Sequence, residues 1–150
     1  MSEFSERLET LRQDIVEQGE RVFDIVLSAV ESYFDLDREK ATAAVAADDA
    51  VDKVDVEIER DSIPLLGMGV TDEHSIRSVL TIVKINNELE RIADGAVVIA
   101  EIVESYPEDL NDHPPDTFRV MANSVIGMLR DANRSFAQSN TTLAQRVLVF

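Results

Sequence analysis

Apolar residues recur at intervals of three and four positions along most of the chain, the spacing that places them on one face of an α-helix. Such stripes cover residues 4–33, 38–64, 71–105, 118–136 and 141–150. Because short connections join the first three stripes, the pattern predicts three long antiparallel helices, followed by a fourth long helix and a short C-terminal helix. The predicted fold class is therefore all-α.

Residues typical of helix ends stand between the stripes. Asp37 is placed to cap the second helix, and Thr71 or Asp72 is placed to cap the third. Pro64 is expected to end the second helix, because proline has no backbone N–H to donate. The two prolines at positions 114–115 suit the start of the fourth helix. These signals place the helix boundaries independently of the apolar stripes.

Two pairs of acidic residues stand four positions apart inside the second and third predicted helices. The pairs are Asp48 with Asp52, and Glu90 with Asp94. Because four residues advance a helix by only about 40° beyond a full turn, each pair projects both carboxylates from one face. Two such faces brought together offer the oxygen ligands that hard cations prefer. The spacing therefore predicts a metal site between these helices.

The second acidic pair belongs to a stripe that begins as an apolar one. Its members are Ile76, Leu80, Val83, Asn87, Glu90, Asp94, Val97 and Glu101. We expect this stripe to be the buried face of the third helix. A buried carboxylate pair needs a counter-charge, a proton or a cation. Metal coordination meets this need, with Asn87 as an additional or supporting ligand.

The first acidic pair lies beside a conventional core stripe. That stripe comprises Ala44, Ala47, Val51, Val54 and Ile58. Asp48 and Asp52 stand about 90° around the helix from it, on the shoulder of the buried face. Asp55 follows within the next turn and is a further candidate ligand. For these residues a solvated acidic face is the alternative interpretation.

Charge and composition narrow the possible partners. The 150 residues include 30 acidic and 14 basic side chains, and the net charge of −16 argues against direct nucleic-acid binding. Cysteine is absent, which excludes thiolate ligands, and His74 and His113 do not form a spaced pair. Oxygen atoms must therefore hold any metal, and iron, manganese, magnesium, calcium and zinc all stay open. The acidity also suits a salt-rich cell interior.

The sequence contains no recognisable targeting or membrane segment. Residues 1–11 mix acids and bases and have no apolar signal core. No apolar run approaches the roughly 20 residues needed to span a bilayer. We therefore expect a soluble cytoplasmic protein.

One segment is similar to a known family signature. Residues 84–94, Lys-Ile-Asn-Asn-Glu-Leu-Glu-Arg-Ile-Ala-Asp, resemble the motif ending in Glu-Arg-Ile-Gly-Asp of the PhoU family of phosphate-signalling regulators. Residues 75–77 and the acidic segment 48–55 resemble two further motifs of that family. The sequence departs from the family pattern at Ala93, where glycine is usual, and at Ser75, where aspartate is usual.

The resemblance implies an architecture and a metal site. PhoU proteins typically consist of two tandem three-helix repeats, each with a multinuclear metal site built from Glu/Asp-x-x-x-Asp motifs. Here those motif positions are held by Asp48, Asp52, Glu90 and Asp94. On this interpretation, residues 1–106 form one complete repeat. Residues 107–150 form a truncated second repeat, with the fourth helix and the start of the fifth.

The resemblance also implies a function. It predicts a regulator of phosphate uptake and phosphate-starvation signalling that is not an enzyme. Such a regulator links a phosphate ABC transporter to a membrane sensor histidine kinase, and it reaches the membrane only through these partners. The last residues of the chain are apolar, namely Val147, Leu148, Val149 and Phe150. We therefore expect a homodimer in which the last two helices cover apolar surface.

Two other functions stay open at this stage. A carboxylate-bridged hydrolase or oxidase is the first, although such sites normally contain Glu-x-x-His pairs, which this sequence lacks. A purely structural bundle without metal is the second. In that bundle Glu90 and Asp94 would pair with basic residues such as Arg12 or Arg21.

Overall fold

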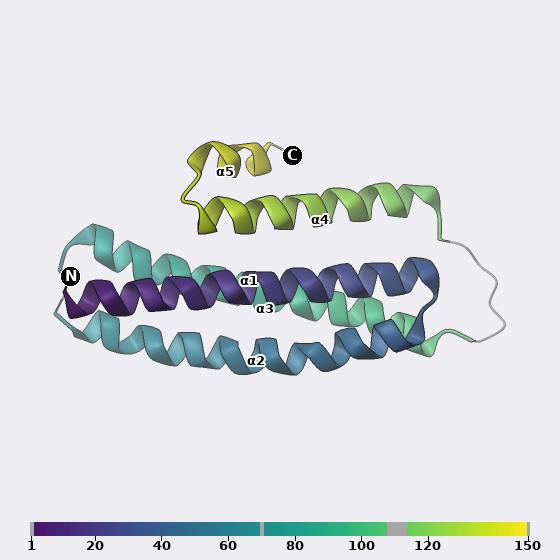
Figure 1. Ribbon diagram of the computed structural model, residues 1–150, viewed down its shortest axis with the longest axis horizontal. Helices are drawn as coiled ribbons and strands as arrows, with labels where there is room; N and C mark the ends of the chain where they lie inside the picture. The colour runs from purple at the N-terminus through teal and green to yellow at the C-terminus, as the bar shows by residue number, and fades with distance from the viewer. Residues whose placement is uncertain (1, 70, 108–113, 150) are drawn as a thin grey trace.

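The computed structural model describes residues 2–69, 71–107 and 114–149, and it is built from helices (Figure 1). The helices are α1 (Glu3–Asp35), α2 (Arg38–Gly67), α3 (Glu73–Ser105), α4 (Asp116–Ala137) and α5 (Thr141–Leu148). None of the described residues lies in a β-strand. The all-α prediction is confirmed, and so are the three long antiparallel helices that precede a fourth long helix and a short last one.

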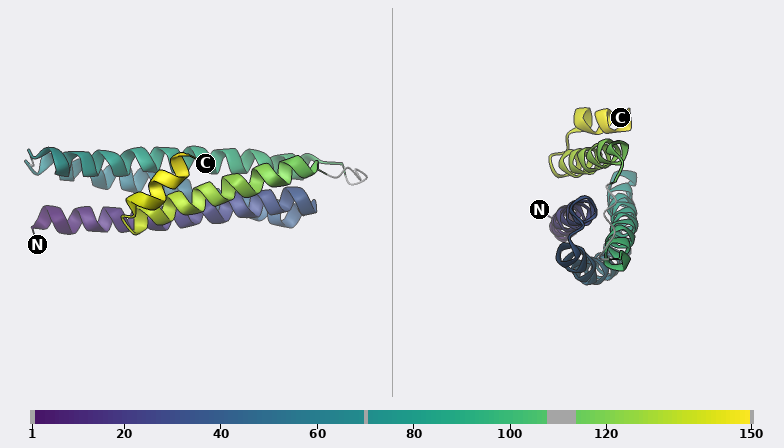
Figure 2. Two further views of the ribbon diagram at one scale, coloured as in Figure 1. Left: turned by 90° about the horizontal axis from the view of Figure 1, so that it is seen from above. Right: turned by 90° about the vertical axis from the view of Figure 1, so that its right-hand side faces the viewer.

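Helices α1, α2 and α3 form a bundle in which each helix packs against the other two (Figures 1 and 2). Their shared core is aliphatic and contains many alanines, which allow the helices to approach closely. Its members from α2 and α3 include Ala41, Ala44, Val51, Ile58, Val79, Ile82, Leu89, Ala93, Ala96 and Ala100. Burial of these side chains is the main stabilising contribution to the bundle.

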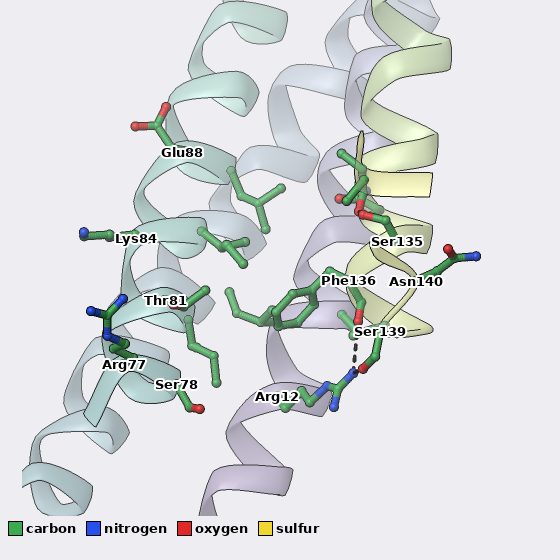
Figure 3. Close-up of a pocket in the computed structure, with 18 of the residues that line it drawn as sticks. Arg12, Arg77, Ser78, Thr81, Lys84, Glu88, Ser135, Phe136, Ser139 and Asn140 are labelled. Carbon is green, nitrogen blue, oxygen red and sulfur yellow. Dashed lines mark hydrogen bonds between the residues drawn. The ribbon is translucent and has the colours of Figure 1, made fainter. Parts of the chain in front are cut away.

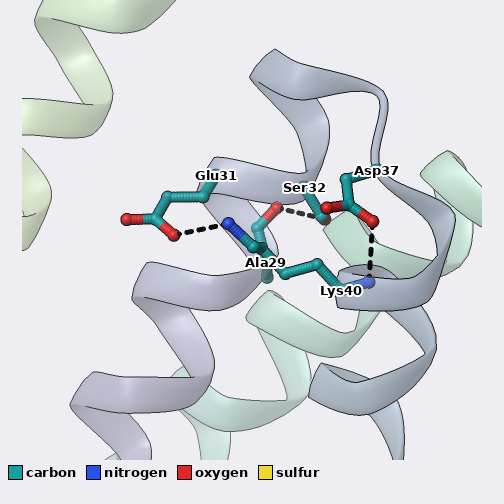
Figure 4. A network of polar contacts seen from close by, with 5 residues as sticks. All are labelled: Ala29, Glu31, Ser32, Asp37 and Lys40. Atoms are coloured by element: carbon teal, nitrogen blue, oxygen red, sulfur yellow. Dashed lines mark hydrogen bonds and ion pairs between the residues drawn. The ribbon is translucent and has the colours of Figure 1, made fainter.

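The turn between α1 and α2 is fixed by local polar contacts (Figure 4). The Asp37 carboxylate accepts a hydrogen bond from the backbone N–H of Lys40 at 3.0 Å, which confirms the predicted cap. The Lys40 ammonium in turn pairs with Glu31 of α1 at 2.9 Å. The buried Ser32 hydroxyl donates to the carbonyl oxygen of Ala29 at 2.7 Å. These contacts set the direction in which α2 leaves α1.

The end of α2 differs from the prediction. The helix continues through Pro64 to Gly67, so the expected end at Pro64 is wrong. A proline this close to a helix end removes a hydrogen bond from a carbonyl group of the exposed Arg60, which water can satisfy. The buried Leu65 packs in the core and holds the last turn in place. The predicted cap of α3 is correct, because Asp72 accepts a hydrogen bond from the N–H of Ser75.

Helix α4 lies along α1 on the outside of the bundle (Figure 2). The Asn133 side chain of α4 donates to the carbonyl oxygen of Gly19 at 2.8 Å. The absence of a side chain at Gly19 allows this approach, because a Cβ there would lie 3.0 Å from Asn133. Leu129 is the one buried residue of α4. The sequence predicted a longer apolar stripe on α4, and its first members, such as Phe118 and Met121, are exposed.

None of the helices in the described ranges combines the length and the apolar character that a membrane crossing requires.

Candidate acidic site between α2 and α3

The buried face of α3 is not the one that the sequence analysis selected. The buried stripe consists of Val79, Ile82, Asn86, Leu89, Ala93, Ala96, Ala100 and Val103. On the expected stripe, Asn87, Asp94 and Glu101 are exposed, and Glu90 is half-buried. The expectation of a fully buried carboxylate pair is therefore wrong. Because α3 must pack against both α1 and α2, it buries the stripe on which apolar residues continue along the whole helix. Asn86 is the one polar member of that stripe.

The structure nevertheless brings the two predicted acidic pairs to one place, the line along which α2 and α3 pack. Three acids of α2 face two acids of α3 across this line: Asp48 lies within electrostatic reach of Asp94, and Glu90 within reach of Asp48, Asp52 and Asp55. The acids of α2 lie opposite those of α3 because the two helices run antiparallel. Moving towards the C-terminus along α2 therefore means moving towards the N-terminus along α3. We call these five residues, Asp48, Asp52, Asp55, Glu90 and Asp94, the acidic seam.

Burial and mutual repulsion act on the carboxyls of the acidic seam. Partial burial raises the pKa of Asp48 above its usual value, and the neighbouring carboxylates of Asp52 and Asp94 raise it further. The pKa of Glu90 is raised by burial, then by Asp94 and Asp55. Burial also raises the pKa of Asp55. The ionised form of each of these three carboxyls is therefore less favourable in the folded protein than in a fully solvated carboxyl.

No basic side chain offsets this charge in the described part of the chain. None of the ion pairs among the described residues includes a member of the acidic seam. Arg12 instead bonds to the Phe136 carbonyl oxygen, and Arg21 pairs with Glu17. The hypothesis that these arginines neutralise Glu90 and Asp94 is therefore wrong.

Two features of the acidic seam bear on cation binding, namely its uncompensated negative charge and one unsatisfied oxygen. The Oδ1 atom of Asp48 is buried and has no hydrogen-bond partner. Such an atom loses its hydration without replacement, which is unfavourable unless a donor or a cation reaches it. Among the described residues, no three histidine or carboxylate side chains converge closely enough to hold one ion. Asn87, also predicted as a ligand, is exposed.

Two buried amides beside the acidic seam were missed by the sequence analysis. Asn86 of α3 donates from Nδ2 to the Asp55 carboxylate at 2.6 Å, and Gln18 of α1 donates from Nε2 to the Val51 carbonyl oxygen at 2.8 Å. The sequence does contain a signal for Asn86, because it interrupts the stripe from Val79 to Val103 that is otherwise free of polar residues. The neighbouring Asn87 was selected instead, about 100° away around the helix.

Neutralising Asp48 is expected to stabilise the metal-free protein at neutral pH. Because the pKa of Asp48 is raised in the folded state, the folded state binds the proton more tightly than the unfolded chain does, and stability falls as the pH rises above about 4. Asp48→Asn should therefore gain about 0.5 kcal/mol at pH 7, the size of a like-charge pair one helical turn apart. Urea unfolding with a chelator present measures this gain.

The control for this substitution is Asp24→Asn, at an exposed position of α1. This variant should unfold as the unchanged protein does at both pH 7 and pH 3.5. The gain of Asp48→Asn should largely disappear at pH 3.5, because the raised pKa of this carboxyl leaves it mostly protonated in the folded state there. A gain that persists at pH 3.5 would show that charge is not its cause.

A groove of about 940 Å³ lies beside α3 (Figure 3), on the face that carries Thr81, Ile85 and Glu88 and not Glu90 or Asp94. Helices α1, α3, α4 and α5 line it, and Phe136 of α4 points into it. Arg77, Lys84 and Glu88 stand along its outer edge on α3. At the end of α5, Leu148 and the residue that follows the helix, Val149, are exposed at 84% and 86%. These exposed apolar side chains could contribute to an interface in the predicted homodimer, which stays a prediction. Phe150 and His113 lie outside the described residues.

Comparison with known proteins identifies the family. The PhoU domain model matches residues 15–103, which include both predicted acidic pairs and most of the three-helix bundle. The chain belongs to the PhoU family. The PhoU homologue of Aquifex aeolicus, a phosphate-specific transport system accessory protein, is 29% identical over 141 residues, or 94% of this chain and 64% of that protein. The corresponding homologue of Zymomonas mobilis is 28% identical over 96% of this chain and 61% of its own length.

The PhoU fold is also evident from a solved structure. The phosphate transport system regulatory protein PhoU from Streptococcus pneumoniae superposes with a TM-score of 0.86, at 23% identity, over 97% of this chain and 68% of that one. Among the first curated PhoU relatives, this chain spans 61–66% of the length of each relative. These relatives are named as accessory or regulatory proteins of phosphate transport, which agrees with the prediction of a regulator and not an enzyme. The division into repeats at residues 1–106 and 107–150 stays a prediction.

Proposed function

We propose that this chain is a regulator of phosphate uptake and phosphate-starvation signalling. On this proposal it acts through metal-dependent binding to a phosphate ABC transporter and to a sensor histidine kinase. The support for the phosphate role is its membership of the PhoU family, whose curated relatives are named as accessory proteins of phosphate-specific transport. A phosphoester hydrolase would also need a basic side chain beside the metal site to hold the substrate phosphate, and none of the ion pairs among the described residues brings one to the acidic seam.

The observation that carries the metal part is the acidic seam itself. Five carboxylates from two helices share one line without a basic partner among the described residues. We propose Asp48, Asp52, Glu90 and Asp94 as ligands, with Asp55 in addition. A bound divalent or trivalent cation supplies the missing positive charge and links α2 to α3. Metal binding would then stabilise the bundle, and above the dissociation constant the free energy of unfolding would rise with the logarithm of the free ion concentration.

The expected result is that a site variant loses both its metal and its regulatory effect. Asp48→Asn, Asp52→Asn, Glu90→Gln and Asp94→Asn combined remove the charge of the four principal proposed ligands at almost constant volume. The unchanged protein should contain stoichiometric metal by elemental analysis, and the combined variant none. In a strain lacking the gene, phosphate uptake at high external phosphate should be excessive. The unchanged gene should restore control, and the variant gene should not.

The matched control removes four charges elsewhere. Glu9→Gln, Asp24→Asn, Glu39→Gln and Glu101→Gln change the net charge equally, and all four positions are exposed. This control should keep its metal and restore uptake control. A metal-free, folded wild-type protein after incubation with iron, manganese and magnesium would reject the metal site and favour a structural bundle. Failure of the unchanged gene to restore control would reject the regulatory role.

A further inference from the structure

Asn86 is a buried polar residue whose contacts differ from those of the rest of the core. Its side chain is 1% exposed, and it lies on the buried stripe of α3, where it contacts α2. Its Nδ2 donates to two atoms of Asp55, the main-chain oxygen at 3.0 Å and the carboxylate Oδ1 at 2.6 Å. Its own Oδ1 is buried without a partner. A leucine here would fill similar volume without the cost of an unsatisfied acceptor.

Gln18 provides a comparison within the same bundle. It is fully buried in α1, and its Nε2 donates to the main-chain oxygen of Val51, one turn before Asp55 on α2. Its Oε1 is likewise buried and unpartnered. Both amides thus attach a neighbouring helix to the α2 backbone, and both leave one acceptor unsatisfied. Asn86 differs because it also holds a carboxylate.

The position of that carboxylate matters because its neighbours repel it. Asp52 and Glu59 lie within electrostatic reach of Asp55 on α2, and Glu90 lies within reach across the acidic seam. Because these neighbours repel it, the Asp55 carboxylate would rotate towards solvent if no donor held it. The amide of Asn86 donates to Oδ1 from the α3 side and opposes this rotation. The second carboxylate oxygen of Asp55 keeps its capacity to accept a donor or a cation.

We propose that Asn86 is a positioning residue that fixes the Asp55 carboxylate at the acidic seam and so makes Asp55 a ligand of the cation bound there. This inference rests on the metal binding proposed above. A carboxylate already held in one orientation loses less conformational freedom when the ion binds. Residues that orient metal ligands in this way typically contribute 10- to 100-fold to metal affinity. The fixed orientation also exists before metal arrives, so it can be measured in the metal-free protein.

The test compares Asn86→Leu with Gln18→Met, using the manganese ion alone as the probe. Each substitution keeps side-chain volume and deletes one amide that bonds to the α2 backbone. Asn86→Leu should weaken manganese binding about 10- to 100-fold by calorimetry, and Gln18→Met should change it less than about twofold. Three-bond couplings should show one χ1 rotamer for Asp55 in the metal-free wild type and in Gln18→Met. They should show rotamer averaging in Asn86→Leu.

Each outcome decides the proposal. Equal loss of affinity in both variants, or an unchanged Asp55 rotamer in Asn86→Leu, would overturn it and leave Asn86 as a structural amide. A wild-type protein that does not bind manganese, iron or magnesium would reject the metal site, and with it the ligand role of Asp55. The rotamer measurement would still report whether Asn86 holds Asp55. Asn86→Ala should give the same rotamer averaging, and it replaces Asn86→Leu if the leucine variant does not fold.

Discussion

Ile58→Ala is expected to destabilise the protein by about 2–5 kcal/mol, the range for removing a large aliphatic side chain from a core. Ile58 is 2% exposed and lies on α2, where it packs in the centre of the three-helix bundle. Its truncation removes apolar contacts and leaves a cavity that long, regular helices cannot easily close. Urea unfolding followed by circular dichroism at 222 nm measures the loss.

Ile63→Ala is the matched control for this experiment. It makes the same truncation on the same helix at a position that is 63% exposed. Its effect should stay within about 0.5 kcal/mol, as for most surface substitutions. Similar losses in the two variants would show that Ile58 is not buried between the helices. That result would also undermine the orientation of α2 that directs its acids towards α3.

Gly19→Leu is expected to displace α4 from α1. A Cβ at Gly19 would lie 3.0 Å from both Cγ and Oδ1 of Asn133, and a leucine would extend further into α4. Overpacking of this kind typically costs about 1–3 kcal/mol. Because α1 is the only bundle helix along which the described part of α4 packs, the helix has no second support. Hydrogen exchange should therefore become much faster in α4 and stay slow in the centre of the three-helix bundle.

Gly95→Leu is the control for the effect of the leucine itself. Gly95 lies in the interior of α3, and a Cβ there would meet nothing within 4 Å. Exchange in α4 should be unchanged in this variant. The protein should gain up to about 1 kcal/mol, because leucine favours a helix more than glycine does. Unchanged exchange in α4 of Gly19→Leu would contradict the close contact between α1 and α4.

The helices themselves could be predicted because their signals are local. The apolar periodicity gave their number and order, and the capping residues Asp37 and Asp72 gave two starts that the structure confirms. The resemblance to the PhoU family was carried mainly by residues 84–94, and the family model matches residues 15–103. Local signals were insufficient at Pro64, where core packing of Leu65 extends α2 past a residue that usually ends a helix.

The candidate site was predicted in part. The spacing of Asp48 with Asp52 and of Glu90 with Asp94 placed each pair on one helix face, and both faces do meet. The predicted burial of Glu90 and Asp94 on α3 was wrong, since Asp94 is exposed and Glu90 is half-buried. Periodicity offers several stripes on a helix as rich in apolar residues as α3. The choice among them depends on two neighbouring helices at once.

The sequence by itself determined that this protein is helical, where most of its helices begin, and which carboxylates share a helix face. These properties depend on contacts between residues three or four positions apart, which a sequence displays directly. Only the tertiary structure decided which face of α3 is buried, that Asn86 and not Asn87 reaches α2, and that α4 rests on Gly19. Those choices depend on how separate helices fit together, and the residues that make these contacts lie 31 and 114 positions apart in the chain.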